Sequence, residues 1–191
     1  MRTARNQAIQ IAREILSQNP VYLDTETTGI DRSSEIVEIC ILDDDAQILF
    51  QSLVKPTVSI PPDVIRIHGI TNEMVKSAPS WLTVWPLVEA TLTGRQVGIY
   101  NADFDLRMMQ QTHTKFHIPW RFNRMVSSFC IMRLYAQFYG EWNPAYASYR
   151  WHSLEAAGRH CQIPLPNTHR AYDDALLARQ VLHHIAKSGP D

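Results

Sequence analysis

Two acids stand one residue apart in the strand-like segment V-Y-L-D-T-E-T-T-G at residues 21–29. Successive side chains of a strand point to opposite faces, so Asp24 and Glu26 share one face. Two carboxylates held side by side on a mostly apolar strand repel each other and lose hydration. A divalent cation between them would remove both costs. The spacing therefore favours a metal site over the alternative, a strand end with two solvated acids.

A chain of 191 residues is expected to form one domain, spanning 1–191, that buries a sizeable core. Its formal net charge is −1, so nucleic acid would be held locally, with metal ions offsetting phosphate charge. Three separated cysteines without a C-x-x-C pair suggest neither a zinc site nor a disulfide framework. No apolar run reaches membrane-spanning length, and the N-terminus lacks an apolar signal core. We expect a cytoplasmic protein without a membrane partner.

The hydrophobic pattern predicts an α/β fold. Three antiparallel strands followed by alternating helices and strands indicate a mixed sheet with helices on both faces. The expected elements are a helix at 4–18, strands at 21–26, 35–43, 46–55 and 96–100, a Pro-rich segment with short helical pieces at 60–80, helices at 80–92, 103–113, 127–139, 153–161 and 170–187, and an aromatic loop at 140–152.

A second acidic cluster, Y-N-A-D-F-D-L-R-M-M, lies at residues 100–109. At helical spacing Asp105 shares the more apolar face with Met108 and Met109. Asp103 lies on another face, at a position suited to a helix N-cap. We therefore predict that Asp105 belongs to a site and that Asp103 caps the helix. The alternative is that both acids only favour a helix N-terminus.

A third cluster, N-T-H-R-A-Y-D-D-A, lies at residues 167–175. Asp174 is in register with the apolar positions 177, 178, 181 and 185, so it is predicted on the buried face, whereas Asp173 is predicted to be solvated. His169 is expected in the loop just before the helix, where it could lean over the acids. A histidine in such a place is more often structural, and the neighbouring buried acid favours a role in the site.

The three motifs together resemble the DEDD superfamily of 3′–5′ exonucleases, in the branch with a catalytic histidine (DEDDh). This branch includes the proofreading epsilon subunit of bacterial DNA polymerase III, ribonuclease T and oligoribonuclease. D-x-E-T-T-G matches at 24–29, N-A-x-F-D at 101–105 and H-x-A-x-x-D-A at 169–175, and I-H-G-I-T at 67–71 resembles the proofreading group. One departure is Tyr100, which stands where the family often has histidine.

The resemblance implies a ribonuclease-H-like fold over 20–187, preceded by an N-terminal helical extension at 1–19. It also implies a nuclease that releases nucleoside 5′-monophosphates from the 3′ ends of single-stranded DNA or RNA, with two divalent cations, Mg²⁺ or Mn²⁺. Carboxylate oxygens suit these ions better than zinc. By resemblance, His169 would take a proton from the attacking water. The implied metal ligands are Asp24, Glu26, Asp105 and Asp174.

Substrate contacts are also implied by the resemblance. The residues that correspond to the family's terminal-nucleotide pocket are Thr27, His68, Ile70, Asn101 and Phe104. The alternative for His68 is a loop histidine bonded to backbone. The aromatic residues Trp142, Tyr146, Tyr149 and Trp151 could stack single-stranded bases, but packing on a core edge is favoured.

Two other functions fit the same motifs. One is a proofreading subunit that acts with a DNA polymerase. The other is a catalytically silent nucleic-acid-binding module of the same fold, against which the intact set of four acids and one histidine argues. The choice between ribose and deoxyribose depends on pocket details that the sequence does not fix.

Overall fold

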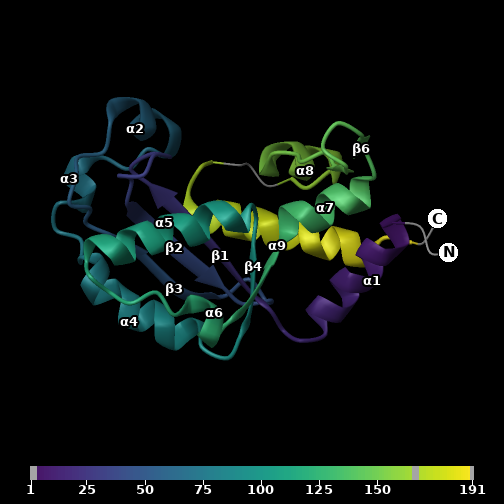
Figure 1. The fold of residues 1–191 in the computed structure, drawn as a ribbon, viewed down its shortest axis with the longest axis horizontal. Coiled ribbons are helices and arrows are strands. Elements are labelled where there is room, and N and C mark those ends of the chain that lie inside the picture. Colours follow the sequence, from purple (N-terminus) through teal and green to yellow (C-terminus); the bar gives the residue numbers. More distant parts are fainter. Residues whose placement is uncertain (1–3, 165–167, 190–191) are drawn as a thin grey trace.

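The fold is built around a five-stranded sheet with the order β3-β2-β1-β4-β5 (Figure 1). β1–β2 and β2–β3 pair antiparallel, whereas β1–β4 and β4–β5 pair parallel. This arrangement confirms the predicted mixed sheet. The strands are β1 (Val21–Thr27), β2 (Ile36–Leu42), β3 (Ile48–Leu53), β4 (Gln96–Ile99) and β5 (Ser127–Cys130).

The computed structural model describes residues 4–164 and 168–189. Residues 1–3 of the expected extension, and residues 165–167 and 190–191 of the expected domain, lie outside the described residues. Within the described ranges, no helix combines the length and the apolar character needed to cross a membrane.

Helices cover both faces of the sheet, as predicted. One face packs against α1 (Ala4–Leu16), α7 (Ile131–Tyr139), α8 (Leu154–His160) and α9 (Ala171–Lys187), and the other against α4 (Trp81–Leu92) and α5 (Ala102–Lys115). Figure 1 shows α9 running beside α7 and α1. Three short helices complete the fold: α2 (Pro62–His68), α3 (Asn72–Val75) and α6 (Phe122–Met125).

Side chains alternate between the two faces of the sheet along β1, and this determines which face carries Asp24 and Glu26. Tyr22 is buried with Cys40 and Leu42 in the core beneath α9, whereas Leu23 is buried in the core on the α4–α5 side. Asp24 and Glu26 follow Tyr22 at intervals of two residues, so they lie on the α9 face. The strand thus delivers two carboxylates to the start of the last helix.

The segment at 127–139 is not one helix. Residues 127–130 form β5, which pairs with β4 so that Phe129 lies beside Gly98, and the helix begins only at Ile131. A Cβ atom on Gly98 would lie 2.6 Å from the Phe129 ring, so the strand pairing depends on the missing side chain. Four residues are too short to display a strand period, which is why the pattern was dominated by the following helix.

The predicted cap of α5 is also wrong. The N-cap residue is Asn101, which adopts a left-handed conformation with φ 62° and makes no side-chain cap hydrogen bond. Asparagine tolerates this conformation, so β4 passes into the helix through a single sharp turn. Asp103 instead lies in the first turn and pairs with Arg133 at 2.5 Å.

The N-terminal helix is part of the core. Its buried residues, Ala8, Ile9, Ala12 and Ile15, pack with α7 and α9. Arg13 donates from Nε to the carbonyl oxygen of Ala186 at 2.8 Å and from Nη2 to that of Ser188 at 3.0 Å. α1 therefore holds the far end of the helix whose first turn carries Asp174.

Candidate active site

Three carboxylates converge where the end of β1 meets the start of α9. Side-chain oxygen atoms of Asp24, Glu26 and Asp174 all lie within 4.8 Å of one another. Asp174 reaches the strand because it lies on the buried face of α9, in phase with Leu177 and Val181, as its helical register predicted. Residues 150 positions apart in the sequence therefore form one acidic cluster.

The electrostatics of this cluster are unfavourable without a cation. Burial, followed by the charge of Asp173, raises the pKa of Asp174 to about 7. Burial, followed by the charge of Asp174, raises the pKa of Glu26 to about 9, and burial and Asp105 raise the pKa of Asp24 well above its ordinary value. The cluster therefore favours either protons or a bound positive charge.

A divalent cation fits this donor set. The Oδ1 atom of Asp174 is buried and has no hydrogen-bond partner among the described residues. A buried carboxylate oxygen without a donor is costly, and a metal ion would satisfy it. The donors are all carboxylate oxygens, which suit hard ions such as Mg²⁺ or Mn²⁺.

Asp105 lies beside the cluster but is held differently. It is buried in the first turn of α5, where its Oδ1 accepts hydrogen bonds from the Thr25 backbone N–H at 3.1 Å and the Thr25 hydroxyl at 2.7 Å. Burial raises the pKa of Asp105 to about 7, partly offset by the hydrogen bonds from Thr25. Its fixed position leaves it adjacent to the three converging acids rather than among them.

One pocket of about 200 Å³ joins these acids to the histidine motif. We call it the acidic pocket. Its lining residues are Asp24, Thr25, Glu26, Tyr100, Phe104, Asp105, Leu154, His169 and Asp174. His169 is exposed and left-handed, with φ 52°, and lies in the loop directly before α9, as expected. The pocket therefore combines acids, an imidazole and apolar walls.

Four other residues of the implied nucleotide pocket lie outside the lining of the acidic pocket. Ile70 is fully buried in a small core beneath α2 and α3, and Asn101 is the half-buried cap of α5. Thr27 is buried, and its hydroxyl donates to the Gly29 carbonyl at 2.6 Å. Of the five implied contacts, only Phe104 lines the pocket.

His68, the fourth of these residues, is bonded to backbone through both ring nitrogens. Its Nδ1 accepts from the Ile70 N–H at 3.0 Å, so Nε2 carries the proton and donates to the Thr27 carbonyl oxygen at 3.2 Å. Burial lowers its pKa, which keeps the ring neutral. His68 therefore ties the end of α2 to the end of β1.

A buried ion pair lies behind the histidine and was not predicted from the sequence motifs. Glu38 is directly opposite Glu26 in the β1–β2 ladder and is 1% exposed. Its carboxylate binds the Arg170 guanidinium at 2.6 and 3.0 Å and accepts from the Ala171 N–H at 3.1 Å. The sequence does contain a sign of this pair, because Glu38 is the one charged residue in the otherwise apolar strand I-V-E-I-C-I-L. The pair fixes the residue after His169 to the sheet.

Tyr100 was noted only as a departure from the family motif. It is buried, lines the acidic pocket, and donates its hydroxyl hydrogen to the His152 carbonyl oxygen at 3.0 Å. The phenol therefore ties the pocket wall to the segment that leads into α8.

The chain is similar to known exonucleases in sequence and in fold. The family model described as "RNase_T: Exonuclease" matches residues 21–182. An uncharacterized exonuclease, CP81, of Escherichia phage 186 is 36% identical over 184 residues, which cover 94% of both chains. The structure of exonuclease X in complex with 5′ overhanging duplex DNA has a TM-score of 0.63 and 26% identity, covering 90% of this chain and 93% of that one.

The epsilon subunit of DNA polymerase III from Pasteurella multocida is 27% identical over 176 residues. The match covers 86% of this chain and 65% of the subunit, so this chain spans about two thirds of that relative. The family model covers most of the chain, and its matched range includes all three motifs. The chain therefore belongs to the RNase T exonuclease family, the DEDD group of 3′–5′ exonucleases.

Proposed function

We propose that this protein removes nucleoside 5′-monophosphates one at a time from the 3′ ends of single-stranded DNA or RNA. The observation that carries the proposal is the convergence of Asp24, Glu26 and Asp174 within 4.8 Å, with a buried Asp174 oxygen to which no described residue donates a hydrogen bond. Acids alone would repel phosphate, so the same cluster must take up cations before it can approach a polyanion.

Two divalent cations, Mg²⁺ or Mn²⁺, are proposed to complete the site. Asp24, Glu26 and Asp174 would hold one, and Asp105 would face the other together with Asp24. When bound, such ions neutralise the carboxylates and stabilise charge on the attacking and leaving oxygens of the phosphodiester.

His169 is proposed to accept a proton from the attacking water. It lines the pocket from the loop before α9, and the Glu38–Arg170 pair fixes its neighbour in the chain. A general base needs a defined position near the proton, and the anchoring of the adjacent Arg170 supports this role. Phe104 would contact the terminal nucleotide from the pocket wall.

Four further residues are proposed to shape the site for the nucleotide through the backbone. His68 and Ile70 close the turn that holds Thr27 at the end of β1. Asn101 sets the turn from β4 into α5, which carries Asp105. Their substitution would thus move the walls of the pocket rather than remove a reacting group.

The deciding experiment is a product gel with 5′-labelled single-stranded DNA and RNA in Mg²⁺, Mn²⁺ or EDTA. We expect a descending ladder with either cation, none in EDTA, and resistance of a 3′-blocked strand. The Asp174→Asn variant, prepared in parallel, controls for contaminating nucleases. Cleavage of a closed circular single strand, or full activity after exhaustive EDTA dialysis, would contradict the proposal.

A second function is suggested by the relatives named as epsilon subunits of DNA polymerase III. In that case a polymerase would deliver the 3′ end. Removal of a mismatched 3′ nucleotide should then accelerate when a purified replicative polymerase is added. If the rate is unchanged and the protein does not co-elute with the polymerase, the result would support a free-standing nuclease instead.

A further inference from the structure

A small aromatic hairpin projects between α7 and α8. It consists of β6 (Trp142–Asn143) and β7 (Ser148–Tyr149) where a loop was expected. Trp142 is 54% exposed, Tyr146 80% and Trp151 58%. The expectation that these rings cover a core edge is therefore wrong for three of the four, and only Tyr149 is half-buried.

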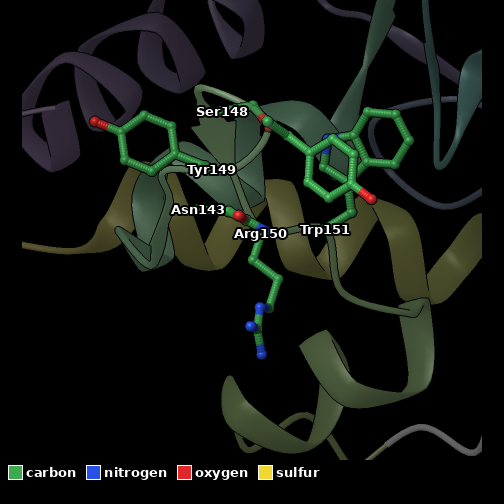
Figure 2. Close-up of a pocket in the computed structure, with 6 residues that line it drawn as sticks. Asn143, Ser148, Tyr149, Arg150 and Trp151 are labelled. Carbon is green, nitrogen blue, oxygen red and sulfur yellow. The ribbon is translucent and has the colours of Figure 1, made fainter.

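The hairpin borders a pocket of about 460 Å³, which we call the aromatic pocket. This size lies within the range of ligand sites. Figure 2 shows Tyr149 and Trp151 on opposite sides, with Arg150 extending away from both. The lining residues are Asn143, Tyr146, Ser148, Tyr149, Arg150 and Trp151.

The hairpin is held in place at its tip and its base. Asn143 accepts from the Ala145 N–H at 3.1 Å, and Trp142 packs edge-on against Tyr149 with ring centres 5.2 Å apart. At the base, the Arg150 N–H donates to the Glu141 carbonyl oxygen at 2.8 Å. Exposed rings on a fixed scaffold need little ordering on binding, which is what a stacking surface requires.

The aromatic pocket lies close to the acidic pocket along the chain. Trp151 is three residues before Leu154, which lines the acidic pocket, so their Cα atoms are at most about 11 Å apart. Between them, Tyr100 of the acidic pocket donates to the His152 carbonyl. Figure 1 shows the hairpin next to α8. A strand leaving the acidic pocket would reach the hairpin within a few nucleotides.

The chemistry of the surface fits a single strand. Aromatic faces stack on any base, and interleaved cations contact phosphates. Arg150 supplies the cation. Its side chain is 60% exposed and pairs with Glu141 at 3.2 Å, an exposed pair of little strength that a phosphate can replace. The polar groups of Asn143 and Ser148 border the same pocket.

We propose that the aromatic hairpin is an accessory site that stacks the bases of a single strand a few nucleotides before its 3′ end. This site rests on the proposed function, because its closeness to the acidic pocket, together with the exposed rings and Arg150, favours nucleic acid as the occupant. A second copy of the chain and another protein are the other possible occupants, and the experiment distinguishes them.

The test measures binding separately from hydrolysis. The variants are Tyr146→Ala and Trp151→Ala, and the control is Leu87→Ala, which removes an exposed apolar side chain of similar exposure, 55%, from α4. Binding of a fluorescent, 3′-blocked eight-nucleotide strand, which should resist hydrolysis, is measured in Mg²⁺. KM and kcat are measured in Mg²⁺ for the unblocked strand and for a dinucleotide. Circular dichroism verifies folding.

Each aromatic variant should bind the eight-nucleotide strand about 5- to 150-fold more weakly, the usual range for loss of one stacked base. Hydrolysis of the dinucleotide should not change, and neither should any property of Leu87→Ala. Equal losses on dinucleotide and long strand would overturn the accessory site. Absence of hydrolysis in the wild type, with binding still sensitive to the variants, would instead reject the proposed function and keep the binding site.

Abasic substitution gives an independent test of stacking. Replacing the second to fourth nucleotides from the 3′ end with abasic spacers should weaken wild-type binding as much as the variants do. Combining spacer and variant should cause no further loss, since both remove the same contact. Additive losses would overturn the proposal. Altered sedimentation of the variants with unchanged strand binding would assign the hairpin to self-association, and that result would also overturn it.

Discussion

Asp174→Asn should make the metal-free protein more stable at alkaline pH. The substitution removes one charge from the acidic cluster and preserves the shape of the side chain. Asp174 is buried beside Asp24 and Glu26, and one of its oxygens lacks a donor among the described residues. The native state therefore holds this carboxylate at a cost that the unfolded chain does not have.

The pKa of Asp174 gives the magnitude. Burial raises it from 3.8 to about 7, a difference of about 3 units, and each unit corresponds to about 1.4 kcal/mol. Since the folded pKa is the higher one, its contribution to stability is present below pH 3.8 and is lost as the pH rises through 7. The ceiling on the gain from Asp174→Asn at pH 8 is thus about 4 kcal/mol. We expect about 2 kcal/mol, because neighbouring acids take up protons when Asp174 ionises.

The assay is thermal unfolding in EDTA at pH 8 and pH 5. For a chain of this size about 2 kcal/mol corresponds to an increase in Tm of about 4–8 °C. The gain should fall by more than half at pH 5, where the folded carboxyl is already protonated. Adding Mg²⁺ should raise the Tm of the wild type more than that of the variant. Asp103→Asn, an exposed acid in an ion pair with Arg133, should show no gain. A variant that melts no higher than the wild type at pH 8, or whose gain is equal at both pH values, would refute the reasoning.

Three further predictions concern single residues. His169→Ala should lower kcat by about 10²–10⁴-fold, while binding of a 3′-blocked strand in Mg²⁺ is retained; near-normal kcat would exclude it as the base. Asp105→Asn should abolish most turnover and Asp103→Asn should not, because only the former faces the pocket; product gels compare them, and equal losses would show that the helix phase does not matter. Glu38→Ala should lower the free energy of unfolding in urea by about 2–3 kcal/mol, somewhat below the cost of breaking a fully buried pair because Arg170 reaches solvent, and an unchanged midpoint would contradict a structural role.

Periodicity was most informative where a helix has one buried face. The placement of Asp105 and Asp174 on buried faces followed from their spacing to apolar residues and is confirmed by their low exposure. The same reasoning separated Asp105 from Asp103, although it gave the wrong role to Asp103. The face of a helix on which a side chain lies is a local property that spacing can predict. The ion-pair partner of an exposed acid, here Arg133, comes from another helix and cannot be predicted in this way.

Features that depend on residues far apart in the chain could not be predicted from the sequence. The Glu38–Arg170 pair joins residues 132 positions apart, and β5 exists because Gly98 leaves room for Phe129. The prediction that the aromatic residues of the hairpin cover a core edge was wrong for another reason. Composition shows that a ring is apolar but does not show whether anything covers it, so the exposure of Trp151 became visible only in the structure.

The two halves of the acidic cluster lie near opposite ends of the sequence, and this has a consequence for biosynthesis. Asp24 and Glu26 leave the ribosome early, whereas Asp174 follows 150 residues later on the last helix. Domains of this size fold around contacts of high sequence separation only when both partners are available. A nascent chain that lacks α9 therefore cannot assemble the cation site. Hydrolytic capacity is therefore expected only after α9 has been synthesised, so a nascent chain that stops before α9 is not expected to degrade the nucleic acid around it.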